Sequence, residues 1–398
     1  MLIIYAVAQL LVAVYLIIPF FLLVSHYWRK SNKRLLKYKY PVVFDKNFDF
    51  AAIITAHQDV RFIRPLVDSF LKQSYANFIV YIIADDCDTT GLDFPDERIR
   101  IIKPGTPFHA KIRSIKYGVS QFVRDHDVIV IFDADNLVHP DYLKNLNEYF
   151  RHGFEAVQTH MLSKNIDSVY AKLDSMGHVY NTFIERQARM ELGLSSCILG
   201  LGIAIKTGLY REVMYKDTLG GFDKKLQAEI VKRVKQLAFA EDALVYDEKV
   251  TEGNAFERQR TRWIYTYFKY FPDNWSLFIN GLRNLNFNRI YFGFNAMRPP
   301  LFITIGLAII FMVSVFFLDP FISLLWAGII LLFSLTFILI VLTQSRQKGM
   351  GKVFFYLPAL VFRQLKGFLR IKKAKTDFLK TEHSKIVYID DILSNEIL

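Results

Sequence analysis

Hydrophobic positions along this chain follow two patterns, one at its ends and another in its middle. The first 24 residues, and later the stretches 301–318 and 321–343, are apolar at almost every position. Each stretch has about the length that a helix needs to cross roughly 30 Å of hydrocarbon. We therefore predict three membrane-spanning helices, the last two joined at Asp319–Pro320 as a hairpin that crosses and returns.

A cleaved signal peptide is the competing interpretation of the first apolar stretch. No basic segment precedes this stretch, and no small-residue cleavage pattern follows it. We therefore expect a retained membrane anchor whose strongly polar residue is Gln9.

Between these stretches, strand-like and helix-like patterns alternate. Short β-branched apolar runs, typical of buried strands, occur at 51–55, 78–84, 99–102 and 128–132. The segments 62–72 and 110–123 carry apolar residues at helical spacing. This alternation predicts an α/β fold with a mainly parallel sheet flanked by helices, which binds ligands beyond the carboxyl ends of its strands.

The positions of the basic residues predict how the apolar helices are oriented in the membrane. Of 398 residues, 52% are hydrophobic and 22% charged, and 50 Lys and Arg against 38 Asp and Glu give a net charge of +12. Basic residues follow the first apolar stretch at 29–39 and the last at 346–352, which places both flanks in the cytosol. Nucleic-acid binding is not expected, because no helix-turn-helix, zinc or RNA-binding signature accompanies the basic excess.

These patterns divide the chain into seven expected segments. Two short ones, 273–298 and 345–371, combine aromatic or apolar residues with Arg and Lys, which suits the membrane interface. In order, the segments are a transmembrane helix (1–25), a basic juxtamembrane linker (26–47), a cytosolic α/β domain (48–272), interfacial helices (273–298), a transmembrane hairpin (299–344), an amphipathic interfacial helix (345–371) and a cytosolic C-terminal tail (372–398).

Acidic residues follow two of the expected strands. Asp85 comes after the second strand, and Asp133 and Asp135 after the fourth. In an extended segment, residues two apart point to the same side, so Asp133 and Asp135 are expected to present two carboxylates to one Mg²⁺ or Mn²⁺ ion. A plain turn with a helix cap explains the same residues about equally well.

Other chemistries find less support. The chain has neither a P-loop nor a GxGxxG after the first strand, which argues against an ATPase or a dinucleotide enzyme. Histidines such as His57 and His109 show no paired-ligand spacing, so we expect isolated histidines and no zinc. Cys87 and Cys197 are too few for a disulfide framework and fit reduced thiols.

Two later clusters add polar chemistry. Glu241 and Asp242 form a carboxyl pair after a basic helical stretch, and 255–270 reads AFERQRTRWIYTYFKY. On a helix, Gln259 and Trp263 share one face. An amphipathic helix on the membrane is one interpretation, and the other is a site where the indole stacks on a sugar while an arginine clamps a diphosphate.

Taken in order, these motifs resemble those of membrane-bound family 2 glycosyltransferases, the group of cellulose, chitin and hyaluronan synthases. The resemblance covers about residues 48–272 and implies a GT-A fold, a nucleotide-sugar donor (UDP expected) and inversion at the anomeric carbon. The matching residues are Asp85, Lys111, Asp133-Ala134-Asp135-Asn136, Gln158, Gly200-Leu201-Gly202, Glu241-Asp242 and Gln259-Arg260-Thr261-Arg262-Trp263.

The resemblance also implies roles for these residues. Asp85 would contact the base or ribose, Lys111 the nucleotide or donor, and Arg262 the diphosphate, with Asp133 and above all Asp135 as metal ligands. Asp242 would be the general base, beside a Glu241 that shapes the site. The acceptor would be held by the remaining residues of the set, which are Gln259, Trp263, Gly200 and Gly202.

The expected protein is thus an integral enzyme of the cell (inner) membrane that extends a cell-surface polysaccharide. Three expected spans are fewer than polymer synthases have, which argues against a polymer pore within one monomer. The alternatives are a pore formed by an oligomer or by the interfacial helices, an export partner, or no pore. Transfer of one sugar to a polyprenyl-phosphate or other lipid-linked acceptor is the alternative. A non-catalytic membrane scaffold or transport component is a third, but it would be expected to lose acids that this chain retains.

Overall fold

The protein forms two compact units, each built from separate stretches of the chain. The computed structural model describes residues 2–32, 41–214, 221–347, 350–357, 361, 363 and 385–396. What we call the sheet unit comprises Tyr38–Ile166, Gly193–Lys249 and Glu382–Leu398. What we call the helical unit comprises Met1–Lys37, Asp167–Leu192 and Val250–Thr381. The predicted 48–272 domain therefore draws on both units.

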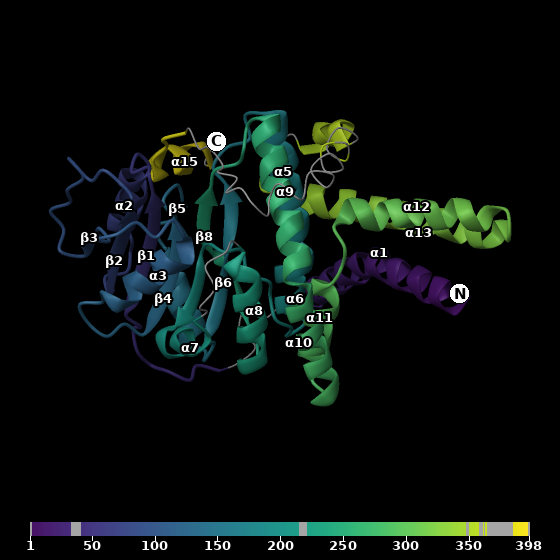
Figure 1. The fold of residues 1–398 in the computed structure, drawn as a ribbon, viewed down its shortest axis with the longest axis horizontal. Helices are drawn as coiled ribbons and strands as arrows, with labels where there is room; N and C mark the ends of the chain where they lie inside the picture. The colour runs from purple at the N-terminus through teal and green to yellow at the C-terminus, as the bar shows by residue number, and fades with distance from the viewer. Residues whose placement is uncertain are drawn as a thin grey trace. The chain divides into compact units, whose positions relative to one another are not determined.

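An eight-stranded sheet forms the centre of the sheet unit, in the order β3-β2-β1-β4-β7-β6-β8-β5 (Figure 1). The four strands predicted from apolar runs are present with almost the expected bounds. The strands are β1 (Phe50–His57), β2 (Phe78–Asp85), β3 (Ile99–Ile102), β4 (Val128–Asp133), β5 (Leu137–Val138), β6 (Ala156–Ser163), β7 (Ile203–Lys206) and β8 (Ala238–Asp247).

The sheet has a parallel half and a mixed half. β1 pairs in parallel with β2 and β4, and β2 pairs in parallel with β3, as the near-continuous apolar runs predict. β7 runs antiparallel to both β4 and β6, β8 runs parallel to β6, and β5 runs antiparallel to β8. The α/β fold is confirmed, and the antiparallel pairs are what the sequence did not indicate.

Helices cover this sheet through their apolar faces. Ile63, Leu66 and Phe70 of α2 are fully buried, and Gly118 of α3 allows its helix to approach Ile83 of β2. The predicted helices at 62–72 and 110–123 are thus confirmed. The helices of this unit are α2 (Ile63–Leu71), α3 (Lys111–Ser120), α4 (Tyr142–Arg151), α7 (Thr207–Val213), α8 (Phe222–Arg233) and α15 (Ile389–Glu396).

The last of these helices, α15, lies in the expected polar tail. Its Ile389 is fully buried and packs with Leu137 of β5 and Tyr246 of β8. Helix α15 therefore packs its apolar side chains against the edge strand β5 and its neighbour β8.

The helical unit holds the apolar helices. Among its described residues, α1 and α13 are long and apolar enough to cross a membrane. Its elements are α1 (Leu2–Ser31), α5 (Val169–Thr182), a π-helix (Phe183–Gln187), α6 (Ala188–Glu191), α9 (Gly253–Lys269), α10 (Phe271–Arg283), α11 (Phe287–Ala296), α12 (Leu301–Phe316), α13 (Pro320–Gln344) and a 3-10 helix (Met350–Tyr356).

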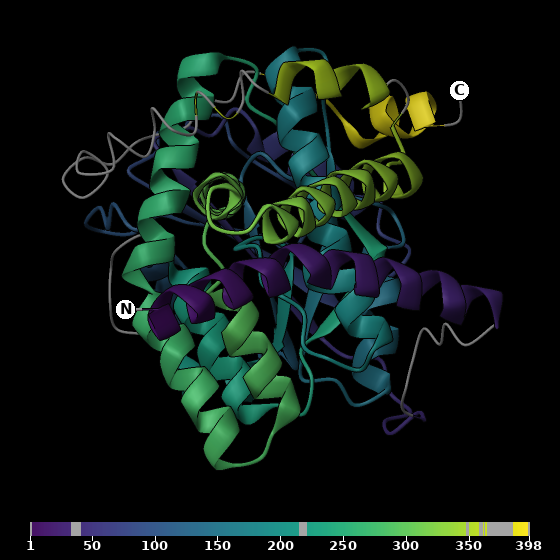
Figure 2. The same cartoon turned by 90° about the vertical axis from the view of Figure 1, so that its right-hand side faces the viewer.

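The predicted second span needs a more exact description. α12 has only 16 residues, and it qualifies as a span only together with α11, from which it is bent by 80°. α12 and α13 do form the predicted hairpin around Asp319, whose carboxylate accepts hydrogen bonds from the first turn of α13 (Figure 2).

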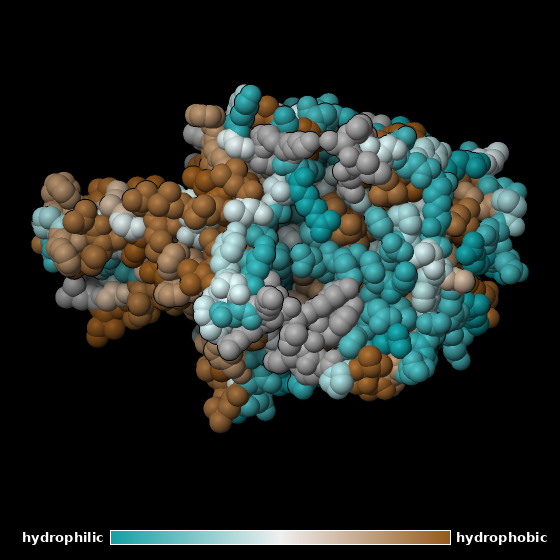
Figure 3. Space-filling view, turned by 180° about the vertical axis from the view of Figure 1, so that it is seen from behind, coloured by the Kyte–Doolittle hydropathy of each residue, from teal (hydrophilic) through white to brown (hydrophobic). Residues whose placement is uncertain are grey.

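Polar contacts join the apolar helices to one another. Gln9 Oε1 accepts a hydrogen bond from Trp326 Nε1 at 2.8 Å, and Tyr5 hydrogen-bonds to Ser314. Such bonds hold helices together where lipid offers no hydrophobic advantage to either face. The outer surface of these helices is hydrophobic, as the brown projection in Figure 3 shows.

α10 and α11 form an antiparallel pair in the segment predicted to be interfacial. Gly281 and Gly293 lie where the two helices touch, each against the backbone of the other helix. Trp275 and Phe287 are exposed, and Leu285 at the connection is 91% exposed. Of the expected interfacial helix at 345–371, most residues after 357 lie outside the described part of the chain.

Candidate active site

Asp133 and Asp242 lie on two distant strands of the sheet that run in the same direction, Asp133 at the end of β4 and Asp242 within β8. Through β7, Ile131 of β4 is in line with Gln158 of β6, which pairs with Phe239 of β8. Asp133 lies two residues beyond this line and Asp242 three residues beyond it. Because neighbouring strands are about 4.8 Å apart, the backbones of β4 and β8 are separated by roughly 14 Å.

The Asp133–Asn136 segment is a turn and not an extended strand. β4 ends at Asp133, whose carbonyl accepts a hydrogen bond from Asn136 N at 3.2 Å. Asn136 Oδ1 accepts from Asp133 N at 2.9 Å, and Asn136 Nδ2 donates to Asp247 at 3.1 Å. The premise of an extended segment was therefore wrong, and Asp135, only 8% exposed, takes its direction from the turn.

Lys111 connects two other predicted site residues, Asp133 and Gly200. Its Nζ donates to Asp133 Oδ1 at 2.6 Å and to the Gly200 carbonyl at 2.9 Å. Lys111 is the first residue of α3, so the start of this helix sets its position. The structure thus brings Lys111, Asp133 and Gly200 together, and the ammonium group places positive charge at the strand end.

The backbone conformation explains why positions 200 and 202 are glycine. Gly200 and Gly202 have φ angles of 70° and 62°, the left-handed region that glycine tolerates best. A Cβ at Gly202 would also collide with Thr159, whose hydroxyl donates to the Gly202 carbonyl at 2.7 Å. Their role toward an acceptor stays a prediction.

Glu241 and Asp242 follow the basic helix α8, as predicted, and lie within strand β8. Ala240 is opposite Thr159 and Leu244 is opposite His160, so 241–243 form a bulge in β8. Bulges turn side chains away from the regular alternation of a strand, often beside active sites.

Residues of α4 hold this bulge in place. Tyr149 donates to Asp242 Oδ1 at 3.1 Å, and Asn145 Nδ2 donates to the Asp242 carbonyl at 2.8 Å. Glu241 remains exposed. Sequence reasoning missed both α4 residues, because nothing in their spacing links them to position 242.

Asp85 occupies a different environment from the one expected of a ligand-binding residue. It is 1% exposed, and its carboxylate accepts hydrogen bonds from the backbone N–H groups of Phe108 and His109 at 2.7 and 2.8 Å. Asp85 therefore holds the segment before α3, and its contact with a base or ribose stays a prediction.

Three further polar residues lie close by. One possible ligand atom from each of His57, Asp86 and His109 lies within 4.8 Å of the others, and His57 Nε2 is 2.8 Å from His109 Nδ1. The expectation of isolated histidines is wrong for this pair. The signal was present, since His57 ends a buried strand as Asp85 does, but 52 residues separate it from His109.

The cysteines add no nucleophile here. Cys87 and Cys197 are buried and free, in agreement with the prediction of reduced thiols. Burial raises the pKa of the Cys87 thiol, so it stays protonated near neutral pH and is a poor nucleophile.

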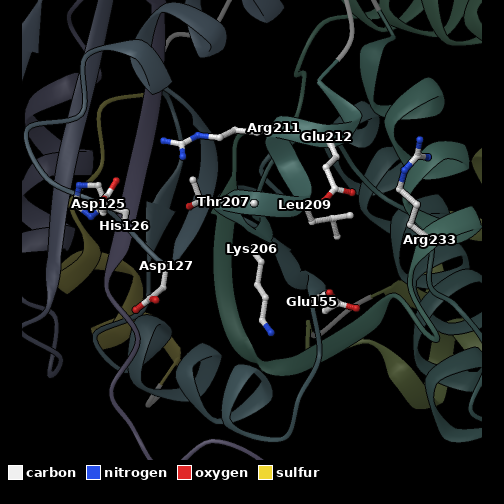
Figure 4. A pocket seen from close by; sticks show the side chains of 11 residues that line it. Asp125, His126, Asp127, Glu155, Lys206, Thr207, Leu209, Arg211, Glu212 and Arg233 are labelled. Atoms are coloured by element: carbon white, nitrogen blue, oxygen red, sulfur yellow. The ribbon is translucent and has the colours of Figure 1, made fainter.

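A cavity of about 600 Å³ lies at the other edge of the sheet (Figure 4). Asp125 to Asp127 directly precede β4, Glu155 directly precedes β6, and Lys206 ends the antiparallel β7. These positions mark the amino-terminal edge of the parallel strands. We place the donor end of the site at the carboxyl end of β4, because Asp133, Lys111 and Gly200 come together there.

The predicted Gln259, Arg262 and Trp263 lie on α9 of the helical unit. Arg260 forms an ion pair with Asp174 of α5, and its guanidinium stacks over the Trp263 ring at 4.5 Å. Trp263 is 44% exposed. Burial lowers the pKa of Arg260, while Asp174 opposes that shift. Their approach to the carboxylates of the sheet unit stays a prediction.

The family model described as glycosyltransferase-like family 2 matches residues 47–266. The chain belongs to this family. This family 2 chain is similar in fold to the mannosyltransferase PcManGT from Pyrobaculum calidifontis, solved with GDP-Man and Mn²⁺. The TM-score is 0.56 at 13% identity, over 91% of this chain and 98% of the other.

A second solved structure is less similar. S. aureus TarS 1-349 in complex with UDP-GlcNAc gives a TM-score of 0.38 at 13% identity, over 55% of this chain and 66% of the other. No curated protein matches the chain. The family model and the similarity to the mannosyltransferase confirm the family and the GT-A-like fold, and the protein is a glycosyltransferase.

Proposed function

We propose that this glycosyltransferase is membrane-integrated, inverts the anomeric carbon and adds sugars from a nucleotide-sugar donor to a growing cell-surface glycan. The observation that carries the proposal is the position of Asp133 and Asp135 at the carboxyl end of β4, with Lys111 held against Asp133.

The donor end of this site suits a divalent ion. Asp133 and Asp135 offer only oxygen ligands, the donor set that Mg²⁺ and Mn²⁺ prefer. When bound, such an ion offsets the negative charge of the leaving nucleoside diphosphate. Lys111, held against Asp133, adds a fixed positive charge with the same effect.

At the acceptor end, Asp242 takes the proton of the attacking hydroxyl group. The acceptor oxygen forms a bond to the anomeric carbon while the bond from that carbon to the diphosphate oxygen breaks. The hydrogen bond from Tyr149 holds the carboxylate in its orientation. Direct displacement from the opposite face inverts the anomeric carbon without a covalent enzyme intermediate.

The donor nucleotide remains to be assigned between two classes. The resemblance to polymer synthases favours a UDP-sugar, whereas the similar mannosyltransferase was solved with GDP-Man. Asp85 supports the segment 108–109 directly before Lys111, so this segment is where we expect the base or ribose to bind.

Two long apolar helices support attachment to the cell membrane, and the basic residues at 29–39 and 346–352 support a site in the cytosol, where nucleotide sugars are made. α1 and α13 are long enough to cross, and the 80° bend between α11 and α12 would place α11 along the interface if α12 crosses. The seven segments of the sequence prediction keep these assignments in our proposal, with 48–272 as the catalytic domain.

The alternative is single transfer to a lipid-linked acceptor, for which the stacking surface of Trp263 matters. The guanidinium of Arg260 covers one face of Trp263, so only the other face is open for stacking on an acceptor sugar. Since the stacking platform was the reason to prefer a growing polymer, product size must decide between the two acceptors.

The test incubates membranes containing the protein with a panel of radiolabelled UDP- and GDP-sugars, followed by sizing of the products. We expect transfer from one donor class, its loss in EDTA and its loss in Asp135→Asn. Asp125→Asn, a change at the other edge of the sheet, is the matched control and should remain active. Full turnover in excess EDTA would remove the metal from the proposal, and no transfer from any donor would contradict the proposed activity.

A further inference from the structure

A hydrogen-bond network supports the turn that carries Asp133 and Asp135. It is formed by three segments of the sheet unit, which are the turn after β4 and the residues at and just beyond the ends of β6 and β8. β6 and β8 run parallel, and Ser163 pairs with Asp247 where both strands end. The turn is therefore in contact with residues that come from two other strands.

The first connection runs from Asp133 to Asp247 through Asn136. Asn136 is fully buried, its Oδ1 accepts from the backbone N–H of Asp133 at 2.9 Å, and its Nδ2 donates to Asp247 Oδ1 at 3.1 Å. A side-chain amide carries both an acceptor and donors, so it can join a backbone N–H group to a carboxylate. The Asp247 carboxylate thus holds the Asn136 side chain, which in turn holds the backbone at Asp133.

The second connection reaches Asp135 through Lys164. Lys164 Nζ donates to the Asp135 carbonyl at 2.9 Å, and the backbone N–H of Lys164 donates to the Asp247 carbonyl at 2.9 Å. Both candidate metal ligands are therefore linked to Asp247, one through an asparagine and the other through a lysine.

Lys249 holds the Asp247 carboxylate from the other side. Lys249 Nζ donates to Asp247 Oδ2 at 3.0 Å, and the lysine side chain is only 3% exposed. The side chain of Asn165 accepts from Lys249 N at 2.7 Å and donates to the Lys249 carbonyl at 3.1 Å. Since apolar side chains often fill the place of a buried ion pair without loss of stability, the pair is better explained by the direction it gives to the turn.

We propose that Asp247 and Lys249 are positioning residues of the donor end, which hold the Asp133–Asn136 turn in the arrangement that binds a divalent ion. The inference rests on the proposed function, in which Asp133 and Asp135 are the metal ligands. Groups that orient metal ligands through hydrogen bonds typically change metal affinity by about 10–100-fold when they are removed. Because Lys249 is buried and acts through Asp247, its loss should affect metal binding and leave the affinity for a nucleotide without metal nearly unchanged.

The experiment measures the binding of Mn²⁺ to the detergent-purified full chain in the presence of UDP or GDP. The electron paramagnetic resonance signal of free Mn²⁺ gives the unbound concentration, and calorimetry without metal gives the nucleotide affinity. We expect Lys249→Met to weaken Mn²⁺ binding by about 10–100-fold. Asn136→Ala, which removes the amide between Asp133 and Asp247, should have an effect of similar size.

A double variant tests whether Lys249 and Asn136 act through one network. Independent effects of Lys249→Met and Asn136→Ala would multiply, whereas the effects of residues in one hydrogen-bond network are not additive. We therefore expect the double variant to bind Mn²⁺ roughly as tightly as the weaker of the two single variants. A loss equal to the product of the two single losses would overturn the common network.

Two controls separate the orientation of the turn from stability. Lys46→Met removes a lysine–aspartate pair at the other edge of the sheet, where Asp127 precedes β4. Tyr81→Phe removes a buried hydrogen bond to His126. Both variants should bind Mn²⁺ as before, even where Tyr81→Phe lowers the midpoint of thermal unfolding.

Asp135→Asn tests the metal role in the proposed function separately. If the unsubstituted chain binds Mn²⁺ and Asp135→Asn does not, unchanged Mn²⁺ affinity in folded Lys249→Met would overturn the inference alone. If Lys249→Met does not fold, Asn136→Ala decides in the same way. No Mn²⁺ binding by the unsubstituted chain, or equal binding by Asp135→Asn, would contradict the metal role and overturn the inference with it. The expected Mn²⁺ losses in a chain without transfer activity would support the inference and speak against the proposed activity.

Discussion

At the level of single residues, Asp242 is the carboxylate whose loss should affect the chemical step most directly. Asp242→Asn keeps the shape and the oxygen that accepts from Tyr149, but it removes the proton acceptor. Loss of a general base lowers the rate by a factor of about 100 to 10,000. We expect this loss in initial rate with nearly unchanged donor affinity, measured by transfer assays and nucleotide binding.

Tyr149→Phe is the companion variant. It keeps the base and removes one hydrogen bond to it, so its loss of rate should be much smaller than that of Asp242→Asn. An Asp242→Asn enzyme with a near-normal rate would show that another group takes the proton.

Trp263 tests a different role. If its open face stacks on the acceptor, Trp263→Ala should weaken acceptor use or shorten the product, with donor affinity unchanged. Trp275→Ala on α10 is the matched control, because Trp275 is similarly exposed, at 51% against 44%, in the same unit. Lower membrane yield with unaltered product length in both variants would assign Trp263 to the membrane interface instead.

At the level of elements, the turn before β7 depends on Gly202. Gly202→Ala forces a left-handed φ on alanine and drives its Cβ into Thr159, beside the bulge of β8. Overpacking of this kind typically costs about 1–3 kcal/mol. We therefore expect a lower midpoint of thermal unfolding together with reduced transfer.

Gly177 of α5 offers a matched control. A Cβ at Gly177 meets no described atom within 4 Å, and alanine favours a helix over glycine by roughly 0.5–1 kcal/mol. Gly177→Ala should therefore unfold at the same or a higher temperature. Equal destabilisation by both substitutions would argue against the steric role of Gly202.

At the level of the whole molecule, the orientation of the apolar helices decides whether the site reaches cytosolic nucleotide sugars. Reporters fused after residue 40 and after residue 350 should both indicate the cytosol, and one inserted at Asp319, between α12 and α13, should indicate the outer side. An outer signal from the first two would contradict the three-span arrangement. A cytosolic signal at Asp319 would mean that the α12–α13 hairpin enters the bilayer without crossing it.

The sequence by itself determined those features that depend on neighbouring residues. Apolar runs gave the parallel strands β1 to β4 and the helices between them, because a strand buried on both faces needs apolar side chains throughout. Long apolar stretches gave α1 and α13, and the rule that ligands bind beyond strand ends gave Asp85, Asp133 and Asp135 as candidates.

Only the tertiary structure decided features that join distant parts of the chain. The bulge of β8, the hydrogen bond from Tyr149 to Asp242 and the meeting of His57 with His109 all depend on strand register and packing. The turn at Asp133–Asn136 is closed by local hydrogen bonds, and Asn136 also bonds to Asp247, more than 100 residues away. A sequence pattern reports what each residue contacts within its own element, whereas these contacts form only when separate elements pack against one another.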